Sequence, residues 1–413
     1  MGKKILIHSL IFSPDGVSTA YLYNDIALKF KDSGYEVVVL TTTPHYNVVE
    51  EQLEKQRSRW KFWGICKESE YNGIKVLHVP QKKFKSTLLR LIGFIYWHIV
   101  SFILGLFVRN VDVILSPSPP LTIGIINLLL GKLKGCKVIY NVQEIYPDIL
   151  KKKEGFIFNF LRKMERFVYN RSDAVTTIDQ VFHDTIVERF EDKSKLHIIP
   201  NFVDTDLYKP KELKSDTLDS ALFPKNDNIK LLYAGNIGFA QDWKPLIALA
   251  EKCKEERIDF FVIGEGVMKS YLIEQKELLT LDNLHILPYQ NRELMPDILA
   301  YSDIQYIFMD PEMDMQGFPS KVYTIMACAK PLLVCSGSQT PIVKFLENYN
   351  CAKLITNKDE RVKVDEMHDW LKSITREDLV EMGQNGLAAI NKYYTKDIVT
   401  GQYLNVINNM LSK

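Results

Sequence analysis

The stretch Gln316-Gly317-Phe318-Pro319-Ser320-Lys321-Val322-Tyr323 lies between an apolar run typical of a strand, residues 304–309, and a segment with helical periodicity, residues 322–329. Proline and serine are favoured where a helix begins, and the hydroxyl of Ser320 is expected to cap the first backbone N–H groups. Lys321 then falls in the first turn, where the helix dipole repels a cation unless an anion lies between them. The stretch predicts a strand–loop–helix connection that holds either an anion such as phosphate or only a solvated lysine.

The same alternation of strand and helix extends in both directions along the chain. Short apolar or β-branched runs are separated by longer segments of helical pattern. The expected strands are residues 5–10, 36–41, 74–79, 111–115, 137–141, 174–178 and 196–199 in the first half, and 231–234, 260–263, 284–287, 304–309 and 332–334 in the second. Continuous apolar strands that alternate with helices predict parallel sheets covered on both faces. The expected fold class is therefore α/β, with two doubly wound domains and a ligand cleft at the carboxyl ends of their strands.

The length of the chain indicates two domains, because 413 residues exceed one typical hydrophobic core. The boundary is expected near Pro200-Asn201-Phe202-Val203-Asp204, which is soon followed by a polar segment with two prolines, residues 209–228. We expect an N-terminal domain over residues 1–200 and a C-terminal domain over residues 201–385. A helical segment over residues 386–413 would then be free to pack back on the first domain.

The composition is that of an ordinary globular protein, 46% hydrophobic and 25% charged, with a formal net charge of +1. This balance excludes a protein that binds nucleic acid through a broad basic field. The 6 cysteines form no C-x-x-C pair, and the histidines do not cluster at metal-ligand spacing. The sequence therefore predicts reduced thiols in a cytoplasmic protein and no metal site.

One segment departs from the soluble pattern. Residues 88–108 are overwhelmingly apolar or aromatic, and the basic stretch Lys82-Lys83-Phe84-Lys85 precedes them. The length suits a membrane span, but Arg90 and His98 count against one, and an expected strand follows at once. Two interpretations stay open: a crossover helix buried between the sheet and its neighbours, or an interfacial helix that dips into the cytoplasmic face of a membrane.

Three expected strands of the second domain end in loops suited to a nucleotide. Gly235-Asn236-Ile237-Gly238 follows the first, and its glycines allow backbone N–H groups to approach a diphosphate. Gly264-Glu265-Gly266 follows the next and is similar to the start of a dinucleotide fingerprint, although Lys269 stands where the third glycine would be. Tyr289 follows the third, where its ring can border a nucleobase. Each loop is also compatible with an ordinary turn, but the ends of parallel strands meet at one edge of a sheet.

The first domain offers its own residues at strand ends. Gly16 follows the first strand and allows a close approach, with Ser18 or Thr19 expected as the cap of the next helix. Glu144 and Asp148 follow a later strand, and either carboxylate can act as a base or orient a hydroxyl group. The alternative is that they cap or salt-bridge the following helix.

Taken in order, these pieces resemble the retaining glycosyltransferases of family 4, which have the GT-B fold of two Rossmann-like domains. The most similar branch is that of bacterial surface-polysaccharide transferases of the fucosamine type, which act in O-antigen and capsule synthesis. The matching pieces span nearly the whole chain: the Gly16 loop, Ser116-Pro117-Ser118-Pro119-Pro120-Leu121, Val142-Gln143-Glu144-Ile145-Tyr146-Pro147, Ile199-Pro200-Asn201-Phe202-Val203-Asp204, Tyr233 to Gly238, Val262-Ile263-Gly264-Glu265-Gly266 and Pro319-Ser320-Lys321-Val322-Tyr323.

The resemblance implies a nucleotide-sugar donor on the second domain and an acceptor on the first. It also implies transfer with retention of the anomeric configuration, no bound metal and no cofactor. By position, the loop 235–238 and Pro319-Ser320-Lys321 would face the donor diphosphate, while residues 264–266 and Tyr289 would border the nucleoside. Electrostatic stabilisation of the leaving diphosphate is then the main catalytic effect.

Two features depart from the family pattern. The family has two glutamates, separated by seven residues, that hold the sugar and the ribose, and this chain has Gln316 and Thr324 there. The arginine and lysine that usually follow the glycine loop are also missing, and Lys244 is the nearest cation. Lys321 therefore becomes the main candidate for positive charge at the diphosphate, with Thr324 as a further donor-binding position.

We expect a sugar transferase that is peripherally associated with the cytoplasmic face of a membrane. It would move an N-acetylated deoxyamino sugar from a UDP-sugar to a polyprenyl-diphosphate-linked saccharide during surface-polysaccharide synthesis. Lys321 and Glu144 are the expected catalytic residues, and Gly16 and Asp148 lie on the acceptor side. Two alternatives stay open: a nucleotide-sugar epimerase of the same fold, which needs no acceptor, and a non-catalytic subunit that binds nucleotide sugars.

Overall fold

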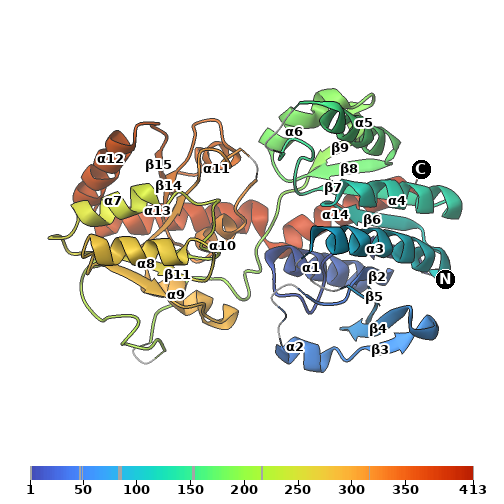
Figure 1. Ribbon diagram of the computed structural model, residues 1–413, viewed down its shortest axis with the longest axis horizontal. Helices are drawn as coiled ribbons and strands as arrows, with labels where there is room; N and C mark the ends of the chain where they lie inside the picture. The colour runs from blue at the N-terminus through green and yellow to red at the C-terminus, as the bar shows by residue number, and fades with distance from the viewer. Residues whose placement is uncertain are drawn as a thin grey trace. The chain divides into compact units, whose positions relative to one another are not determined.

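The computed structural model describes residues 2–45, 48, 50–81, 86–150, 154–214, 217–315 and 317–412. The chain divides into two compact units, and each unit holds one sheet (Figure 1). Unit 1 comprises Met1–Asn201 and Lys396–Lys413, and unit 2 comprises Phe202–Thr395. The chain therefore leaves unit 1 after Asn201 and returns to it at Lys396. Gln316 and the basic stretch at residues 82–85 lie outside the described residues.

Among the described residues, unit 1 holds a nine-stranded sheet in the order β3-β4-β5-β2-β1-β6-β7-β8-β9. Its strands are β1 (Lys4–His8), β2 (Glu36–Thr42), β3 (Arg59–Lys61), β4 (Cys66–Tyr71), β5 (Ile74–Val79), β6 (Val113–Pro117), β7 (Lys137–Val142), β8 (Ala174–Thr177) and β9 (Leu196–Ile198). β1 lies at the centre, where Ile5 pairs in parallel with Val37 of β2 and Val113 of β6. The antiparallel edge of β3 and β4 was not predicted, because β4 reads Cys-Lys-Glu-Ser-Glu-Tyr and lacks an apolar run.

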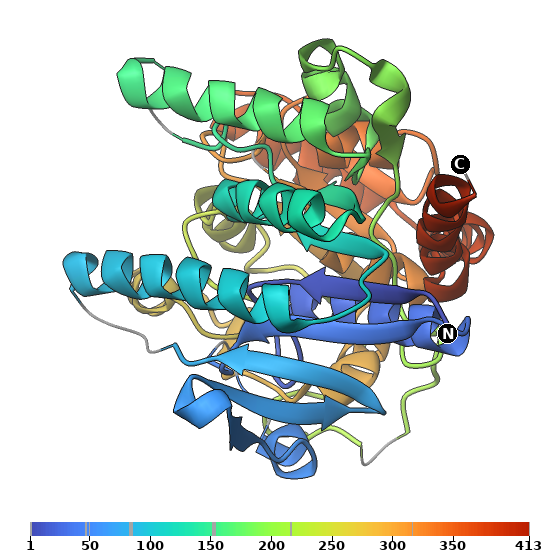
Figure 2. The ribbon, with the colours of Figure 1, turned by 90° about the vertical axis from the view of Figure 1, so that its right-hand side faces the viewer.

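Helices cover both faces of this sheet, as alternate side chains of β7 show. The Tyr140 ring lies 6.1 Å from the Tyr169 ring of α5, whereas Asn141 donates through Nδ2 to Tyr403 Oη of α14 at 3.0 Å. α3, α4 and α5 are successive neighbours on the first face, and α1 packs with α14 on the second (Figure 2). The helices of unit 1 are α1 (Ser18–Asp32), α2 (Glu50–Lys55), α3 (Thr87–Phe107), α4 (Leu121–Lys134), α5 (Phe156–Arg171), α6 (Gln180–Ile186) and α14 (Lys396–Leu411).

The apolar segment at residues 88–108 forms α3, and only part of it is buried. Trp97, Val100 and Leu104 are buried in its second half, while residues 88–92 in its first half are all exposed. The interpretation of a helix buried between the sheet and its neighbours is therefore wrong for this first half. Judged by length and composition alone, α3 is the one helix of the described residues that could cross a membrane, and 33% of its most apolar window is buried.

The described part of unit 2 holds a six-stranded sheet in the order β12-β11-β10-β13-β14-β15, and every pairing is parallel. Its strands are β10 (Ile229–Ala234), β11 (Ile258–Ile263), β12 (Leu284–Leu287), β13 (Ile304–Phe308), β14 (Leu332–Cys335) and β15 (Ala352–Ile355). β15 was not predicted, because Lys353 interrupts its four residues. The two parallel sheets with helices confirm the α/β prediction.

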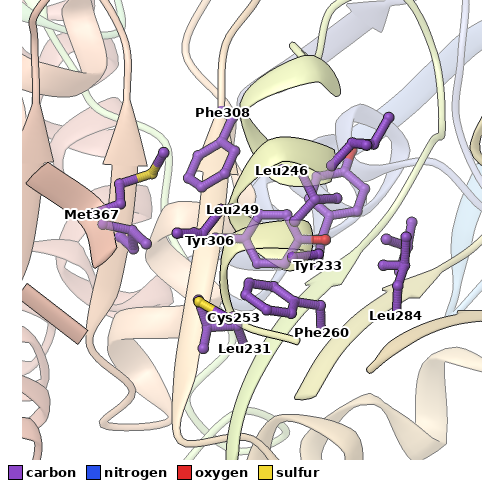
Figure 3. Close-up of a cluster of buried hydrophobic side chains, with 14 of the residues drawn as sticks. Leu231, Tyr233, Leu246, Leu249, Cys253, Phe260, Leu284, Tyr306, Phe308 and Met367 are labelled. Atoms are coloured by element: carbon purple, nitrogen blue, oxygen red, sulfur yellow. The ribbon is translucent and has the colours of Figure 1, made fainter. Parts of the chain in front are cut away.

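The core of unit 2 packs large side chains of neighbouring strands against α7 (Lys244–Lys252). Figure 3 shows Tyr233, Phe260 and Tyr306 grouped beside Leu246 and Leu249. The rings of Tyr233 and Tyr306 are 5.8 Å apart, and both residues are almost fully buried. Because interiors are close-packed, this cluster fixes the Tyr233 ring at the end of β10.

The remaining helices of unit 2 are α8 (Lys269–Leu278), α9 (Met295–Tyr301), α10 (Lys321–Ala327), α11 (Pro341–Leu346), α12 (Glu360–Ser373) and α13 (Arg376–Ala389). α13 packs tightly on the end of α10, since a Cβ at Gly383 would lie 2.1 Å from the Ala329 carbonyl oxygen. A π-helical turn, Ile390–Tyr394, continues α13, and unit 2 ends at Thr395.

Candidate active site

The order of the strands places a candidate site at the carboxyl end of β10. The chain runs outward from β10 to β11 and β12, and then crosses back to β13 on the other side of β10. Such a reversal leaves a crevice between the two loops that follow the central strands, and open α/β sheets bind ligands there. In unit 2 these loops carry Gly235 after β10 and Lys321 after β13.

Lys321 lies at this reversal of strand order, which we call the switch point, and connects the two loops. Its Nζ donates to the Ala234 carbonyl oxygen at 3.1 Å and lies 3.7 Å from the centre of the Tyr233 ring. Among the described residues, no carboxylate lies within ion-pair distance of this ammonium group. Removal from water lowers the pKa of the Lys321 ammonium to about 7. The site therefore holds a withdrawn lysine whose charge lacks an anionic partner, and this favours the anion-site interpretation over a solvated lysine.

The start of α10 differs from the sequence prediction in one respect. Ser320 is the N-cap residue, but its backbone is helical (φ −55°, ψ −21°) and its side chain makes no capping hydrogen bond. The prediction of a hydroxyl cap is therefore wrong, because an extended N-cap backbone is what aims the side chain at the first N–H groups. Pro319 and Ser320 are half-buried beside Lys321, and Thr324 lies one turn further along α10.

The glycines of the two loops are required mainly by packing of the loops on each other. A Cβ at Gly264 would lie 1.9 Å from the Gly235 carbonyl oxygen, and one at Gly266 would lie 2.1 Å from the Ile237 carbonyl oxygen. Gly235 N–H donates to the Ile263 carbonyl at 2.9 Å, and Gly264 N–H donates to the Leu287 carbonyl at 3.2 Å. These two N–H groups are therefore not available to a diphosphate.

Two other N–H groups of the first loop are unpaired. Within the described part of the chain, the backbone N–H groups of Asn236 and Gly238 have no protein acceptor; the Asn236 residue is exposed, and Gly238 is buried. Gly235 also clears the way for Lys321, because a Cβ at Gly235 would lie 2.6 Å from Nζ. The site thus combines one ammonium group with backbone donors, which is a suitable set for a diphosphate.

The loops after β11 and β12 supply the expected nucleoside side. Glu265 forms an ion pair with Lys269 at 2.6 Å, and this contact holds the pKa of the Glu265 carboxyl below its usual range. Tyr289 follows β12 with its side chain 64% exposed. An exposed ring beside a glycine loop offers a stacking surface for a base.

The two acidic candidates of unit 1 have different environments. Asp148 accepts from Arg162 of α5 and, at 2.5 Å, from Arg189, so it salt-bridges the following helix, as one of the alternatives proposed. The Glu144 carboxylate is half-buried, and no hydrogen bond or ion pair to it is found among the described residues. Burial raises the pKa of the Glu144 carboxyl. Of the two groups, Glu144 is thus the one left free to accept a proton.

The loop after β1 holds the last of the predicted positions. Gly16 is half-buried and follows Asp15, whose Oδ1 accepts from the His45 backbone N–H at 2.8 Å. α1 begins at Ser18 with Val17 as its N-cap residue, and no side chain caps it. The prediction that Ser18 or Thr19 caps this helix is therefore wrong, since both residues lie inside the first turn.

The part of the site that the sequence did not reveal is the Tyr233 ring beneath the Lys321 ammonium. Tyr233 was expected only as part of the strand over residues 231–234, and nothing in its spacing indicates contact with a lysine that is remote in sequence. The pairing depends on β10 and β13 being neighbours in the sheet. Strand order is a property of the whole unit, which is why local patterns do not report it.

Comparison with known proteins identifies the family. A family model described as Glycosyltransferase Family 4 matches residues 21–207, and one described as Glycosyl transferases group 1 matches residues 215–387. The chain is 24% identical over 366 residues to WcaI of Escherichia coli K12, described as a colanic acid biosynthesis glycosyl transferase, and the match covers 84% of this chain and 86% of WcaI. The chain is a glycosyltransferase. This confirms the enzyme class predicted from the sequence.

Solved structures show that this glycosyltransferase has the GT-B fold. HepE of Anabaena, solved with UDP, superposes with a TM-score of 0.71 at 14% identity, covering 98% of this chain and 100% of HepE. The catalytic domain of starch synthase IV of Arabidopsis thaliana, solved with ADP and acarbose, superposes with a TM-score of 0.73 at 11% identity, covering 100% of both chains. The predicted fold class is therefore confirmed.

Proposed function

We propose that the glycosyltransferase binds the diphosphate of a UDP-sugar at Lys321 in unit 2. The observation that carries this proposal is the Lys321 ammonium, held against the Tyr233 ring with no carboxylate partner among the residues that the structure describes. A bound diphosphate would supply the missing negative charge, and the N–H groups of Asn236 and Gly238 would add hydrogen bonds. HepE was solved with UDP, which supports a uridine nucleotide as the donor carrier.

The chemistry follows from where charge develops during transfer. The bond between the anomeric carbon and the donor phosphate oxygen breaks, and the acceptor oxygen forms a new bond to that carbon with retention. UDP leaves with its negative charge on the diphosphate, which Lys321 stabilises more strongly in the transition state than in the bound donor. In unit 1, Glu144 takes the proton of the acceptor hydroxyl, and Gly16 lies on the acceptor side.

We infer that the acceptor is a polyprenyl-diphosphate-linked saccharide and that the product enters a surface polysaccharide. WcaI is described as an enzyme of colanic acid biosynthesis, which supports a polysaccharide product. The apolar surface of α3 supports a lipid-linked acceptor and a peripheral position on the cytoplasmic face of a membrane. The sugar proposed for transfer is an N-acetylated deoxyamino sugar, in line with the resemblance to fucosamine-type transferases.

A thermal-shift screen of UDP-, GDP- and ADP-sugars tests the donor. A ligand present at one hundred times its Kd stabilises a protein by about 2.7 kcal/mol, which moves Tm by several degrees. We expect UDP-sugars to raise Tm in the native protein and to lose most of this effect in Lys321→Met. Stabilisation by GDP- or ADP-sugars but not by UDP-sugars would reject the proposed carrier.

A second assay tests transfer itself. Incubation with the donor and a polyprenyl-diphosphate-linked saccharide should release UDP and lengthen the lipid-linked product. Conversion of the sugar without any acceptor would indicate an epimerase. Donor binding without UDP release across a panel of such acceptors would contradict transfer to this class of acceptor.

A further inference from the structure

The exposed half of α3 is the first sign of a further surface. Its exposed apolar residues between residues 88 and 96 share one broad side of the helix, and no residue in this part is buried. A broad apolar side of a helix is normally covered by other apolar groups. Large contiguous apolar patches on a protein surface mark interaction sites. Figure 2 shows the first turns of α3 projecting from the body of unit 1.

The first turns of α5 project on the same side of unit 1 and are also apolar (Figure 2). Phe156 is 86% exposed and Ile157 is 71% exposed, and Phe160 is also exposed one turn later. α4 lies between α3 and α5 and contacts both. The three helices therefore form one layer, and we refer to the outer side of α3, α4 and α5 as the helical face.

The charges of the helical face have a single sign. α3, α4 and α5 contain one acidic residue, Glu165, which is fully buried in ion pairs with Arg162 and Arg189. The exposed charged residues of these helices are all cationic: Arg90, Lys132, Lys163, Arg166 and Arg171. The whole chain has a net charge of only +1, so the positive charge of this face is a local segregation.

On α5 the cations and the aromatic rings share one stripe. Phe156, Phe160, Lys163, Phe167 and Arg171 follow a spacing of three or four residues, which places them on one side of a helix. Val168 and Tyr169 are buried on the opposite side. An amphipathic helix with aromatic residues and Lys or Arg on its outer side is typical of helices that lie in a membrane interface.

We propose that the helical face docks on the surface of an anionic lipid bilayer, with the first turns of α3 and α5 as a pair of apolar contacts. The apolar residues would enter the boundary between headgroups and acyl chains, and the cations would meet the lipid phosphates. A second copy of the chain fits less well, because a symmetric contact would place cations against cations. A spanning α3 would have to withdraw the buried side chains of Trp97 and Leu104 from unit 1.

This inference deepens the membrane part of the proposed function, and it does not depend on the donor or on transfer. It adds α5 as a second contact and an anionic headgroup as the chemistry recognised. Vesicle binding can be measured without any nucleotide sugar. Failure of vesicle binding would leave the donor assay intact, and failure of the donor assay would leave vesicle binding intact.

The test is co-sedimentation of the full chain with vesicles of phosphatidylcholine, with and without added phosphatidylglycerol. The native protein should bind the anionic vesicles and should release them as salt rises. The double substitution Phe156→Ser and Ile157→Ser should lower the partition constant at least about tenfold, because two large apolar side chains no longer enter the interface. Lys163→Glu with Arg166→Glu should lower binding to anionic vesicles only.

Matched controls come from unit 2. Leu278 is 72% exposed and Val380 is 63% exposed, and each lies on a helix of that unit. Their double substitution to Ser should leave vesicle binding unchanged. Equal binding to neutral and anionic vesicles, or unchanged binding by the Phe156/Ile157 variant, would overturn the proposal. Sedimentation as a dimer that this variant dissociates would assign the face to a second copy instead, and retention in the membrane pellet at high salt and alkaline pH would assign α3 as a span.

Discussion

A lysine withdrawn from water and left without a carboxylate is costly to keep in a folded protein. Lys321 occupies such a position against Tyr233 and Ala234, and burial lowers the pKa of its ammonium to about 7. Below that pH the free protein carries the uncompensated charge, and above it the amine is neutral. A bound diphosphate favours the charged form and therefore raises the same pKa.

This linkage predicts how UDP affinity depends on pH. Between about pH 7 and 9 the free protein must take up a proton at Lys321 to bind UDP, so the affinity should fall by as much as about tenfold per pH unit. The phosphate itself is fully ionised in this range, because its second pKa is about 6. Calorimetric titration at several pH values measures the effect. In Lys321→Met the affinity should be weaker and independent of pH over this range, and a native affinity that is also flat would refute the role of Lys321.

Substitution of Glu144 should affect catalysis, whereas substitution of Asp148 should affect stability. Glu144→Gln keeps the size of the side chain but removes its basicity, so kcat should fall at least about a hundredfold while the Kd for UDP stays unchanged. Asp148→Asn should leave Arg162 and Arg189 with a weaker partner and lower the free energy of unfolding by about 1–3 kcal/mol. Steady-state kinetics and urea unfolding of both variants distinguish these outcomes. Loss of stability without loss of kcat in Glu144→Gln would assign that residue to packing.

At the scale of the element, the site is built from loops that touch through their backbones. Gly264 has φ of +144°, and its position leaves no room for a Cβ beside Gly235. The loop after β10 therefore depends on the loop after β11 for its shape, and both depend on the parallel pairing of the two strands. A change in one loop should be transmitted to the other.

Gly264→Ala tests this dependence. The added Cβ meets a backbone carbonyl that cannot move away, so the substitution should destabilise unit 2 by a few kcal/mol and abolish the UDP-induced rise in Tm. Gly401→Ala is the matched control, because it lies inside α14 with no atom within 4 Å of the added Cβ, and alanine there should stabilise by about 0.5–1 kcal/mol. Differential scanning fluorimetry with and without UDP reads out both variants. A native-like response of Gly264→Ala would contradict the close packing of the loops.

The helices and strands also show which features of the fold could be predicted from the sequence. Continuous apolar runs indicated twelve of the strands and the doubly wound fold class, because a strand buried on both faces must be apolar throughout. The polar edge strands β3 and β4 and the short β15 lack that signal. The loops of the candidate site could be located for the same reason, since they follow the buried strands. Helix caps at Ser18 and Ser320 could not be predicted, because a cap needs a backbone angle as well as a suitable side chain.

At the scale of the whole molecule, the last helix belongs to the first unit. α14 buries Val399, Tyr403 and Ile407, and its Tyr403 hydroxyl accepts from Asn141 of β7. Lys29 of α1 forms an ion pair with Asp397 at 3.0 Å. The parallel sheet of unit 1 therefore has one covering helix that the chain supplies only after it has completed unit 2.

Removal of α14 should destabilise unit 1, although α14 is remote in sequence from the rest of that unit. A chain that ends at Thr395 should show a lower unfolding temperature and faster hydrogen exchange in α1 and β7, because it exposes the apolar surface that α14 covers. Unit 2 should keep its own exchange protection. A chain shortened by only the last two residues is the control. Faster exchange in unit 2 and not in unit 1 would contradict this division of the chain.

The return of the chain to unit 1 also sets the order in which the protein can be completed during synthesis. A ribosome releases β10–β15 and their helices before it releases α14, so unit 2 has all its residues while unit 1 still lacks its last helix. Until α14 emerges from the ribosome, the surface of α1 that α14 covers remains exposed. At that stage the nascent chain contains all the residues of unit 2, while unit 1 still lacks α14. We expect a chaperone to bind the surface of unit 1 that α14 later covers.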